Sequence, residues 1–214
     1  MSQIKNIIFD LGGVIINLDI NKTINEFNKL SNKPFESIYT QLQQTSIFDD
    51  FDKGHISESI FFNDLQFALD ANITKENLLL AWNAMLLDFP KSRLDLLQKL
   101  KPHYRLFLLS NTNETHITEF ESTLFTQHGF KNLESFFETV YYSCRIGKRK
   151  PNTDIFMEVL NSNNLNAQET LFIDDSPQHV EGALKTGIQA KLLTKNMEVE
   201  ELLAELGSVS YTHL

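Results

Sequence analysis

The stretch IIFDLGGVII, residues 7–16, sets one carboxylate and two glycines at the end of an apolar run. The residues from Ile4 to Phe9 are typical of a strand that is buried on both faces of a parallel sheet. A carboxylate beside a hydrophobic core is costly unless something compensates it, so Asp10 requires either a partner or a function. The alternative is a strand that simply ends at a turn, because Asp and Gly are common turn residues.

Four further short apolar runs predict more strands, at 104–109, 138–142, 171–173 and 190–193. Helical patterns lie between the later runs, at 90–102, 150–160 and 174–187. Strands that alternate with helices indicate an α/β fold with right-handed crossovers. We therefore predict a doubly wound, mainly parallel, Rossmann-like sheet.

Local signals predict where these helices begin and end. Pro90 opens the first helix, and Pro151 is suited to the first turn of the second. Ser176 is the expected N-cap of the third helix, with Pro177 as its first residue and Gly187 as its C-terminal stop.

The stretch from Ile20 to Met85 contains amphipathic patterns and no convincing strand. It predicts an all-helical insertion after the first strand, whose apolar residues, Trp82 among them, mainly pack against one another. The predicted domains are a core of residues 1–17 and 88–207, a helical domain of residues 18–87, and a tail of residues 208–214.

Composition and charge limit the classes of partner. The chain has 214 residues and a net charge of −9, and this field argues against a nucleic-acid or anionic membrane surface. The single cysteine, Cys144, excludes an internal disulfide and a Cys-rich zinc site. The sequence shows no signal-peptide pattern and no apolar span of ~20 residues, so we expect a cytoplasmic protein.

Polar residues follow three of the predicted strands. Asp10 ends the first strand, Ser110 and Asn111 end the second, and Asp174 and Asp175 end the fourth. Ligands of an open parallel sheet bind beyond the carboxyl ends of its strands, so these groups are expected at one rim. A basic cluster follows the third strand and contains Arg145, Lys148, Arg149 and Lys150.

Three aspartates at one rim need a compensating charge. Two carboxylates about 4 Å apart repel by about 4 kcal/mol at an effective dielectric constant near 20. A divalent cation, a lysine or both would offset this repulsion, and oxygen ligands without His or Cys favour Mg²⁺ over zinc. Such a crevice suits a phosphoryl group that is attacked by a carboxylate.

The ordered motifs FDLGGV, LLSNTN, GKRKP and FIDDS resemble those of the haloacid dehalogenase-like hydrolase superfamily. The chain looks most like the branch with a helical cap, and within it FDLGGVI and LSNTN are similar to phosphatases that act on glucose 1-phosphate. The motifs span residues 9–176, so the resemblance covers most of the chain.

The resemblance implies a role for each motif residue. Asp10 would be the nucleophile and form an aspartyl-phosphate. Ser110 would bind the phosphoryl group with Asn111 beside it, and Lys150 would neutralise phosphate and nucleophile. The partner would be a small phosphate ester.

The resemblance also implies a Mg²⁺ site. Asp10 and Asp175 would bind the ion directly, and the Gly12 carbonyl would supply another ligand. Asp174 would be a ligand through water or would support the other ligands.

Gly12 is a departure from the pattern, because most phosphatases of this superfamily have an Asp there as the general acid and base. Such a group is typically worth ~10²–10⁴ in rate. A cap residue such as Asp19 or His55 could replace it, the leaving group could need less help, as an anomeric oxygen does, or the protein could be a poor enzyme.

Two other functions stay open. A metal-independent 2-haloacid dehalogenase would also use Asp10, although it gives no reason for the acidic pair after the fourth strand. A phosphate-binding or regulatory protein of the same fold would explain Gly12. The sequence predicts surface or capping roles for His116 and His179, and it names neither the substrate nor the oligomeric state.

Overall fold

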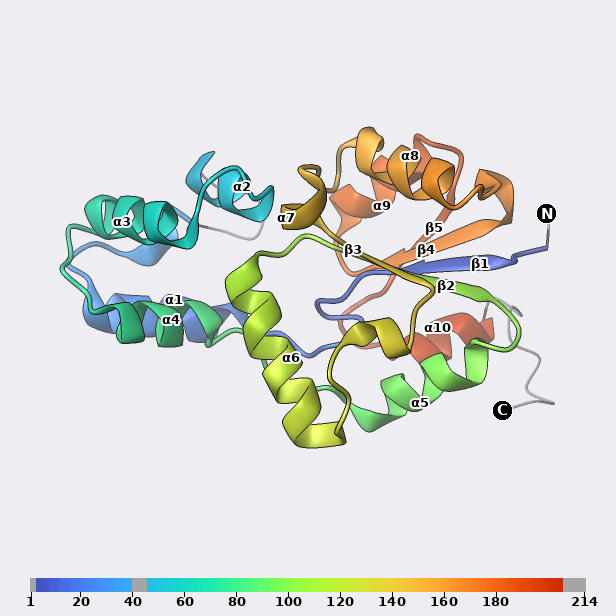
Figure 1. Cartoon of the computed structure of the whole chain (residues 1–214), viewed down its shortest axis with the longest axis horizontal. Helices are drawn as coiled ribbons and strands as arrows, with labels where there is room; N and C mark the ends of the chain where they lie inside the picture. The colour runs from blue at the N-terminus through green and yellow to red at the C-terminus, as the bar shows by residue number, and fades with distance from the viewer. Residues whose placement is uncertain (1–2, 40–45, 206–214) are drawn as a thin grey trace.

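The computed structural model describes residues 3–39 and 46–205, and its core is one parallel five-stranded sheet (Figure 1). The strands lie in the order β3-β2-β1-β4-β5, and every neighbouring pair is parallel. Their bounds are β1 Asn6–Phe9, β2 Arg105–Ser110, β3 Thr139–Tyr142, β4 Thr170–Asp174 and β5 Gln189–Leu192. The α/β fold with a Rossmann-like sheet is confirmed, and each predicted strand agrees within two residues at either end.

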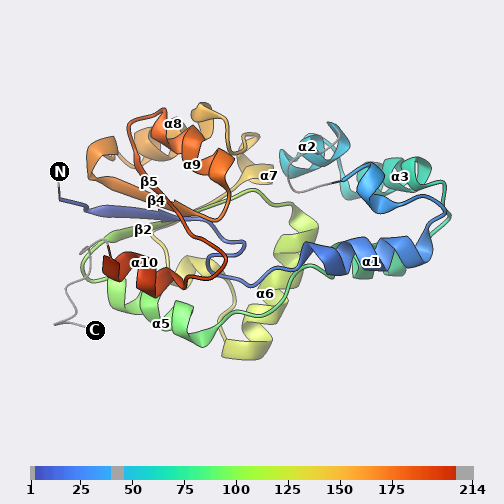
Figure 2. The same ribbon diagram turned by 180° about the vertical axis from the view of Figure 1, so that it is seen from behind.

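Helices cover both faces of the sheet, as Figures 1 and 2 show from opposite sides. One face carries α8 Thr153–Ser162 and α9 Pro177–Leu184. The other carries α5 Lys91–Leu100, α6 Glu114–His128 and α10 Val199–Glu205, and a short helix, α7 Ser143–Ile146, follows β3. Along β1, Ile7 and Phe9 pack into one apolar cluster and Ile8 into the other. This alternation is the period of a strand that is buried on both faces.

Four helices of the insertion lie beyond the carboxyl ends of the strands (Figure 1). They are α1 Ile20–Leu30, α2 Ser46–Asp52, α3 Glu58–Leu69 and α4 Lys75–Asn83. They share an apolar cluster of their own that is rich in aromatic rings. Phe51 and Phe61 stack there with centroids 4.1 Å apart, and Trp82 contacts Phe61 at 4.9 Å. The packing role predicted for Trp82 is confirmed.

The two segments that connect the insertion to the rest of the fold run side by side. Leu18 and Leu86 form an antiparallel bridge, and the Asn17 amide donates to the Asp88 carbonyl at 2.9 Å. The predicted domain limits stay a prediction, and the tail at 208–214 lies outside the described residues. Within the described ranges, no helix has the length and apolar character that a bilayer crossing requires.

Two of the predicted helix limits are wrong. Pro151 lies before α8 and not in its first turn, because it belongs to a turn closed by the Asn152 amide and the Arg149 carbonyl. Gly187 does not end α9, since that helix stops at Leu184 and two tighter turns follow it. Pro90 and Pro177 occupy the predicted positions. Three 3₁₀ turns complete the described elements: Phe35–Ser37, Leu133–Ser135 and Ala167–Glu169.

Candidate active site

The sheet register brings the carboxylates at two strand ends together. Phe9 lies opposite Ile173, so Asp10, which follows β1, and Asp174, which ends β4, lie at the same level of the sheet. One oxygen each from Asp10, Asp174 and Asp175 lies within 4.8 Å of the others. Ser110, the last residue of the neighbouring strand β2, is also buried and lines the same cavity. The common rim that was predicted from the strand ends is therefore present.

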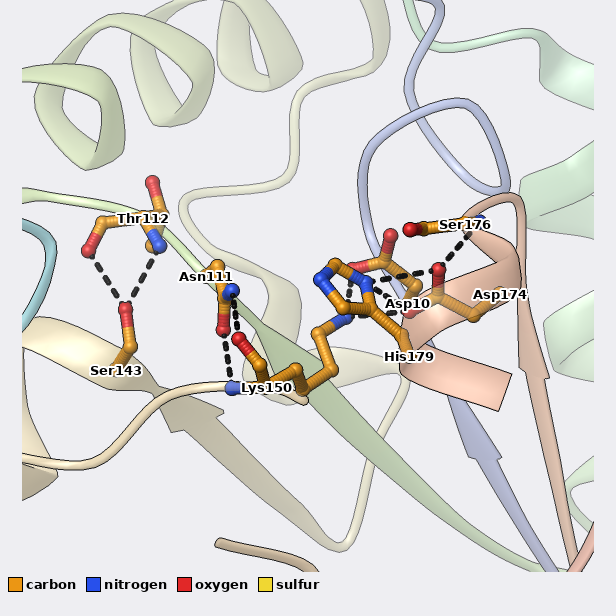
Figure 3. Close-up of polar contacts among 8 residues, drawn as sticks. All are labelled: Asp10, Asn111, Thr112, Ser143, Lys150, Asp174, Ser176 and His179. Carbon is orange, nitrogen blue, oxygen red and sulfur yellow. Dashed lines mark hydrogen bonds and ion pairs between the residues drawn. The ribbon is translucent and has the colours of Figure 1, made fainter. Parts of the chain in front are cut away.

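Lys150 lies between two of these carboxylates (Figure 3). Its Nζ donates to Asp10 Oδ1 and to Asp174 Oδ2, both at 2.7 Å, and its side chain is completely buried. Burial lowers the pKa of Lys150, but the two carboxylates outweigh burial and hold this pKa above its ordinary value. The lysine therefore carries a positive charge although its side chain is buried.

The two carboxylates differ although both contact the same ammonium group. Burial and repulsion by Asp174 raise the pKa of Asp10 to about 7 in spite of Lys150. Burial also acts to raise the pKa of Asp174, but Lys150 and His179 outweigh it and lower the pKa to about 2. The charge of Lys150 is the largest lowering cause, and His179 adds to it because its Nδ1 lies 3.0 Å from Asp174 Oδ1. The same oxygen also accepts a hydrogen bond from the Ser176 backbone N–H at 2.7 Å.

Asn111 fixes the backbone of the lysine. Its amide nitrogen donates to the Lys150 carbonyl and its amide oxygen accepts from the Lys150 N–H, both at 2.9 Å. Beside it, Thr112 and Ser143 bond to each other twice, which joins the loops after β2 and β3 (Figure 3). Both ends of the Asn111 side-chain amide are thus engaged by the Lys150 backbone, and a part for Asn111 in phosphate binding stays a prediction.

Asp175 and the backbone of Gly13 make a close approach on the other side of the cluster. A Cβ atom at Gly13 would lie 2.4 Å from Asp175 Oδ2, and Gly13 has a φ of +71°. Burial and Asp174 raise the pKa of Asp175 to about 6. Three crowded carboxylates, two of them with raised pKa values, form an all-oxygen donor set that fits a divalent cation such as Mg²⁺. Gly12 lines the cavity, and the role of its carbonyl stays a prediction.

The cavity lies between the sheet rim and the insertion. Residues of the insertion supply part of its wall, namely Tyr39, Phe48, Asp52, Trp82 and Met85. Neither Asp19 nor His55, the two cap residues suggested as replacement general acids, lines this cavity. Asp19 caps α1 by accepting from the Asn21 amide, and His55 lies 3.5 Å from Asp50 with half its side chain exposed.

Both histidines near the rim lie in the cavity wall, so the surface roles predicted for them are wrong. His116 is buried, stacks on Trp82 with centroids 4.8 Å apart, and its Nε2 lies 3.2 Å from the Trp82 carbonyl. Burial lowers the pKa of His116 to about 4, so its ring is neutral at pH 7. His179 supports Asp174 from the first turn of α9, a position that the short Asp174-to-helix connection could have indicated.

The four residues of the basic cluster lie partly in the site and partly at the surface. Lys150 forms ion pairs with the site carboxylates, and Arg149 contacts Asp49 and Asp52 of the insertion. Arg145 pairs with Glu114 at 2.8 Å and Lys148 pairs with Glu158 at 2.7 Å, in partly exposed ion pairs.

The structure thus combines a parallel α/β sheet, three carboxylates, a lysine and a serine at the carboxyl edge of that sheet, and inserted helices over the same edge. The family model described as haloacid dehalogenase-like hydrolase matches residues 7–192. The chain belongs to this family, as its four motifs predicted.

Relatives with a described function or structure agree with this assignment. The chain is 30% identical over 187 residues to D-ribitol-5-phosphate phosphatase of Bacteroides thetaiotaomicron, covering 87% of this chain and 90% of that protein. It is 33% identical, with a TM-score of 0.84, to a haloacid dehalogenase family enzyme of the same organism crystallised with magnesium and inorganic phosphate. That match covers 93% of this chain and 98% of the other.

A predicted haloacid dehalogenase-like hydrolase of Porphyromonas gingivalis has a TM-score of 0.86 at 32% identity, over 98% of this chain and all of that one. The predicted enzyme class, a phosphatase-type hydrolase of this family, is confirmed by these relatives together.

Proposed function

We propose that the protein is a Mg²⁺-dependent phosphatase that hydrolyses a small phosphorylated sugar or polyol through an aspartyl-phosphate on Asp10. The observation that carries this proposal is the arrangement around Asp10. Its carboxylate contacts the buried Lys150 and lies within 4.8 Å of the oxygens of Asp174 and Asp175.

The chain's own residues account for the first half-reaction. A carboxylate oxygen of Asp10 attacks phosphorus, the bond to the ester oxygen breaks, and the leaving oxygen departs with the bonding electrons and takes a proton from water to become the alcohol. Lys150 neutralises the growing charge on the phosphoryl oxygens, and the Ser110 hydroxyl donates to one of them. Asn111 holds the lysine at the required position.

Water then attacks the aspartyl-phosphate, which releases inorganic phosphate and restores Asp10. Asp10, Asp175 and the Gly12 carbonyl would hold Mg²⁺, and Asp174 would support them through Lys150. The ion would supply positive charge to the phosphoryl oxygens and favour the ionised form of Asp10.

The substrate class rests on the relative that acts on D-ribitol 5-phosphate. Sugar 1-phosphates stay within the proposal because Gly12 offers no acid to protonate a leaving alcohol, and an anomeric oxygen needs less help to leave.

Turnover tests the proposal. D-ribitol 5-phosphate, glucose 1-phosphate and p-nitrophenyl phosphate are assayed with Mg²⁺ and with a chelator, for the wild type and for Asp10→Asn. We expect turnover only in the wild type with Mg²⁺, and rapid quenching with labelled ester should trap label in a base-labile acyl phosphate. Equal rates for the wild type and Asp10→Asn would reject the proposal.

Gly12 favours one second candidate, a phosphate-binding protein with little or no turnover. Binding of a metal fluoride that mimics the phosphoryl group, without turnover of any ester, would support that candidate. Release of halide from 2-haloacids in a chelator would instead support a dehalogenase, which gives no use to Asp174 and Asp175.

A further inference from the structure

Asp52 reaches the catalytic cavity from the insertion. It is the last residue of α2, its side chain is only 14% exposed, and it lines the cavity together with Asp10 and Lys150. It comes from a segment about 40 residues distant from any of the four sequence motifs, so no motif points to it.

Consecutive basic residues serve two separate acidic groups in this cavity. Lys150 contacts Asp10 and Asp174. Arg149 contacts Asp49 closely and lies 3.8 Å from Asp52. The cavity therefore has a phosphate end at Lys150 and a second polar end where the insertion meets the sheet.

The Asp52 carboxylate keeps acceptor capacity that described residues do not fill. Its contacts with Arg149 Nη2 and Asn113 Nδ2 are both long, at 3.8 Å and 3.5 Å. Burial raises the pKa of Asp52 to about 6 in spite of Arg149. An ionised carboxylate offers about four acceptor positions, so Asp52 can accept further hydrogen bonds from a molecule bound in the cavity.

The surroundings of Asp52 restrict what could fill those positions. Trp82 and His116 are stacked in the same wall, and the His116 ring is neutral and already bonded. A second phosphate or carboxylate placed against Asp52 would be repelled by its carboxylate. A short polyhydroxylated carbon chain can donate hydrogen bonds from its hydroxyl groups to a carboxylate while its C–H groups pack against ring faces.

We propose that Asp52 is a specificity-determining residue that accepts hydrogen bonds from hydroxyl groups on the carbon chain of the substrate. This role rests on the proposed phosphatase function and makes it more specific. The site selects a polyhydroxylated phosphate monoester over an alkyl phosphate of equal length.

Three esters separate the possible roles of Asp52. D-ribitol 5-phosphate has distal hydroxyls, n-pentyl phosphate has the same chain length without them, and p-nitrophenyl phosphate has a good leaving group. We expect Asp52→Ala to lower kcat/KM for the ribitol ester by about 10- to 100-fold, mainly through KM, because a hydrogen bond to a charged group is lost. For the pentyl ester, Asp52→Ala should change kcat/KM by less than about threefold. Asp52→Asn keeps an acceptor oxygen, so it should lower kcat/KM for the ribitol ester by less than Asp52→Ala does.

Asp50→Asn is the matched control, because Asp50 is on the same helix with its side chain 45% exposed. Asp50→Asn should leave kcat/KM unchanged for all three esters. If Asp52→Ala lowers kcat/KM equally for the ribitol and pentyl esters but not for the nitrophenyl ester, the proposal is overturned and Asp52 acts as a general acid. Equal losses on all three esters would overturn it in favour of a purely structural role.

A binding measurement separates this proposal from the proposed function. In the Asp10→Asn background, calorimetry with Mg²⁺ should show tighter binding of D-ribitol 5-phosphate than of n-pentyl phosphate, and Asp52→Ala should remove that preference. If the wild type hydrolyses no ester but the preference depends on Asp52, the catalytic proposal fails and this one stands. If no preference exists, this proposal fails whatever the turnover.

Discussion

Lys150 and Asp174 face each other at 2.7 Å, Nζ to Oδ2, and both side chains are completely shielded from solvent. The same ammonium group lies 2.7 Å from Asp10. One lysine thus compensates two buried carboxylates, so its removal affects folding as well as chemistry.

Lys150→Met should destabilise the protein and abolish turnover. Breaking a buried ion pair by removing one partner typically costs ~3–5 kcal/mol, because the remaining charge stays buried without compensation. Thermal unfolding with a chelator present measures this loss, and steady-state assays measure the turnover.

Lys148→Met is the control for that variant. Lys148 also pairs with a carboxylate, Glu158, but this pair is partly exposed. Exposed pairs contribute little to stability, so this variant should keep both its melting temperature and its activity. Similar losses for the two variants would contradict the role given to Lys150.

Gly13→Ala should disturb the acidic cluster directly. The new Cβ would lie 2.4 Å from Asp175 Oδ2, and the residue would keep a φ of +71°. Gly129→Ala provides the matched control, because Gly129 has a φ of +78° and its added Cβ would meet nothing within 4 Å. Both variants should lose ~1–2 kcal/mol from backbone strain. Only Gly13→Ala should also lose activity, which kcat/KM at saturating Mg²⁺ will show.

The strand ends could be predicted because their placement follows from the sheet alone. Parallel strands in register deliver Asp10, Ser110 and Asp174 to one edge, whatever packs around them. Lys150 is different, since it lies in a loop that the Asn111 amide holds in place. Its role came from the family resemblance and not from periodicity.

The residues of the insertion could not be predicted in the same way. Whether Asp52, Asp19 or His55 enters the cavity depends on how helices with several apolar faces pack against one another and on the sheet. Amphipathic patterns give the helices but not their orientation relative to the rim. His116 was misjudged for the same reason, because its burial depends on Trp82, which α4 supplies.

The stability of the metal-free protein should fall as pH rises from about 4 to about 7. The pKa of Asp10 is raised to about 7 and that of Asp175 to about 6, from an ordinary value near 4. Between these values the folded state binds more protons than the unfolded state, so unfolding becomes easier as pH rises. Melting temperatures with a chelator, taken at intervals across this range, measure the slope.

Mg²⁺ should reduce that slope, because it compensates the ionised carboxylates and stabilises the folded state that binds it. Asp10→Asn should show a shallower slope than the wild type even in chelator. If the melting temperature of the wild type in chelator rises between about pH 4 and pH 7, the raised pKa values of Asp10 and Asp175 are contradicted.

Asp175→Asn and Asp174→Asn should fail in different ways. Both oxygens of Asp174 already accept hydrogen bonds, from Lys150 on one side and from the Ser176 amide on the other. Asp175 instead lies against the Gly13 backbone, where it can reach an ion. We expect Asp175→Asn to raise the Mg²⁺ concentration for half-maximal activity by at least about tenfold without lowering the melting temperature in chelator.

Asp174→Asn should lower the melting temperature in chelator, since the group with a pKa of about 2 stabilises the fold through Lys150 at neutral pH. Its effect on the Mg²⁺ requirement should be smaller than that of Asp175→Asn, because it supports the ligands without being the main one. Mg²⁺ titrations of activity and melting curves on both variants make the comparison. If Asp174→Asn requires more Mg²⁺ for half-maximal activity than Asp175→Asn does, Asp174 is the direct ligand of the ion and Asp175 the supporting residue.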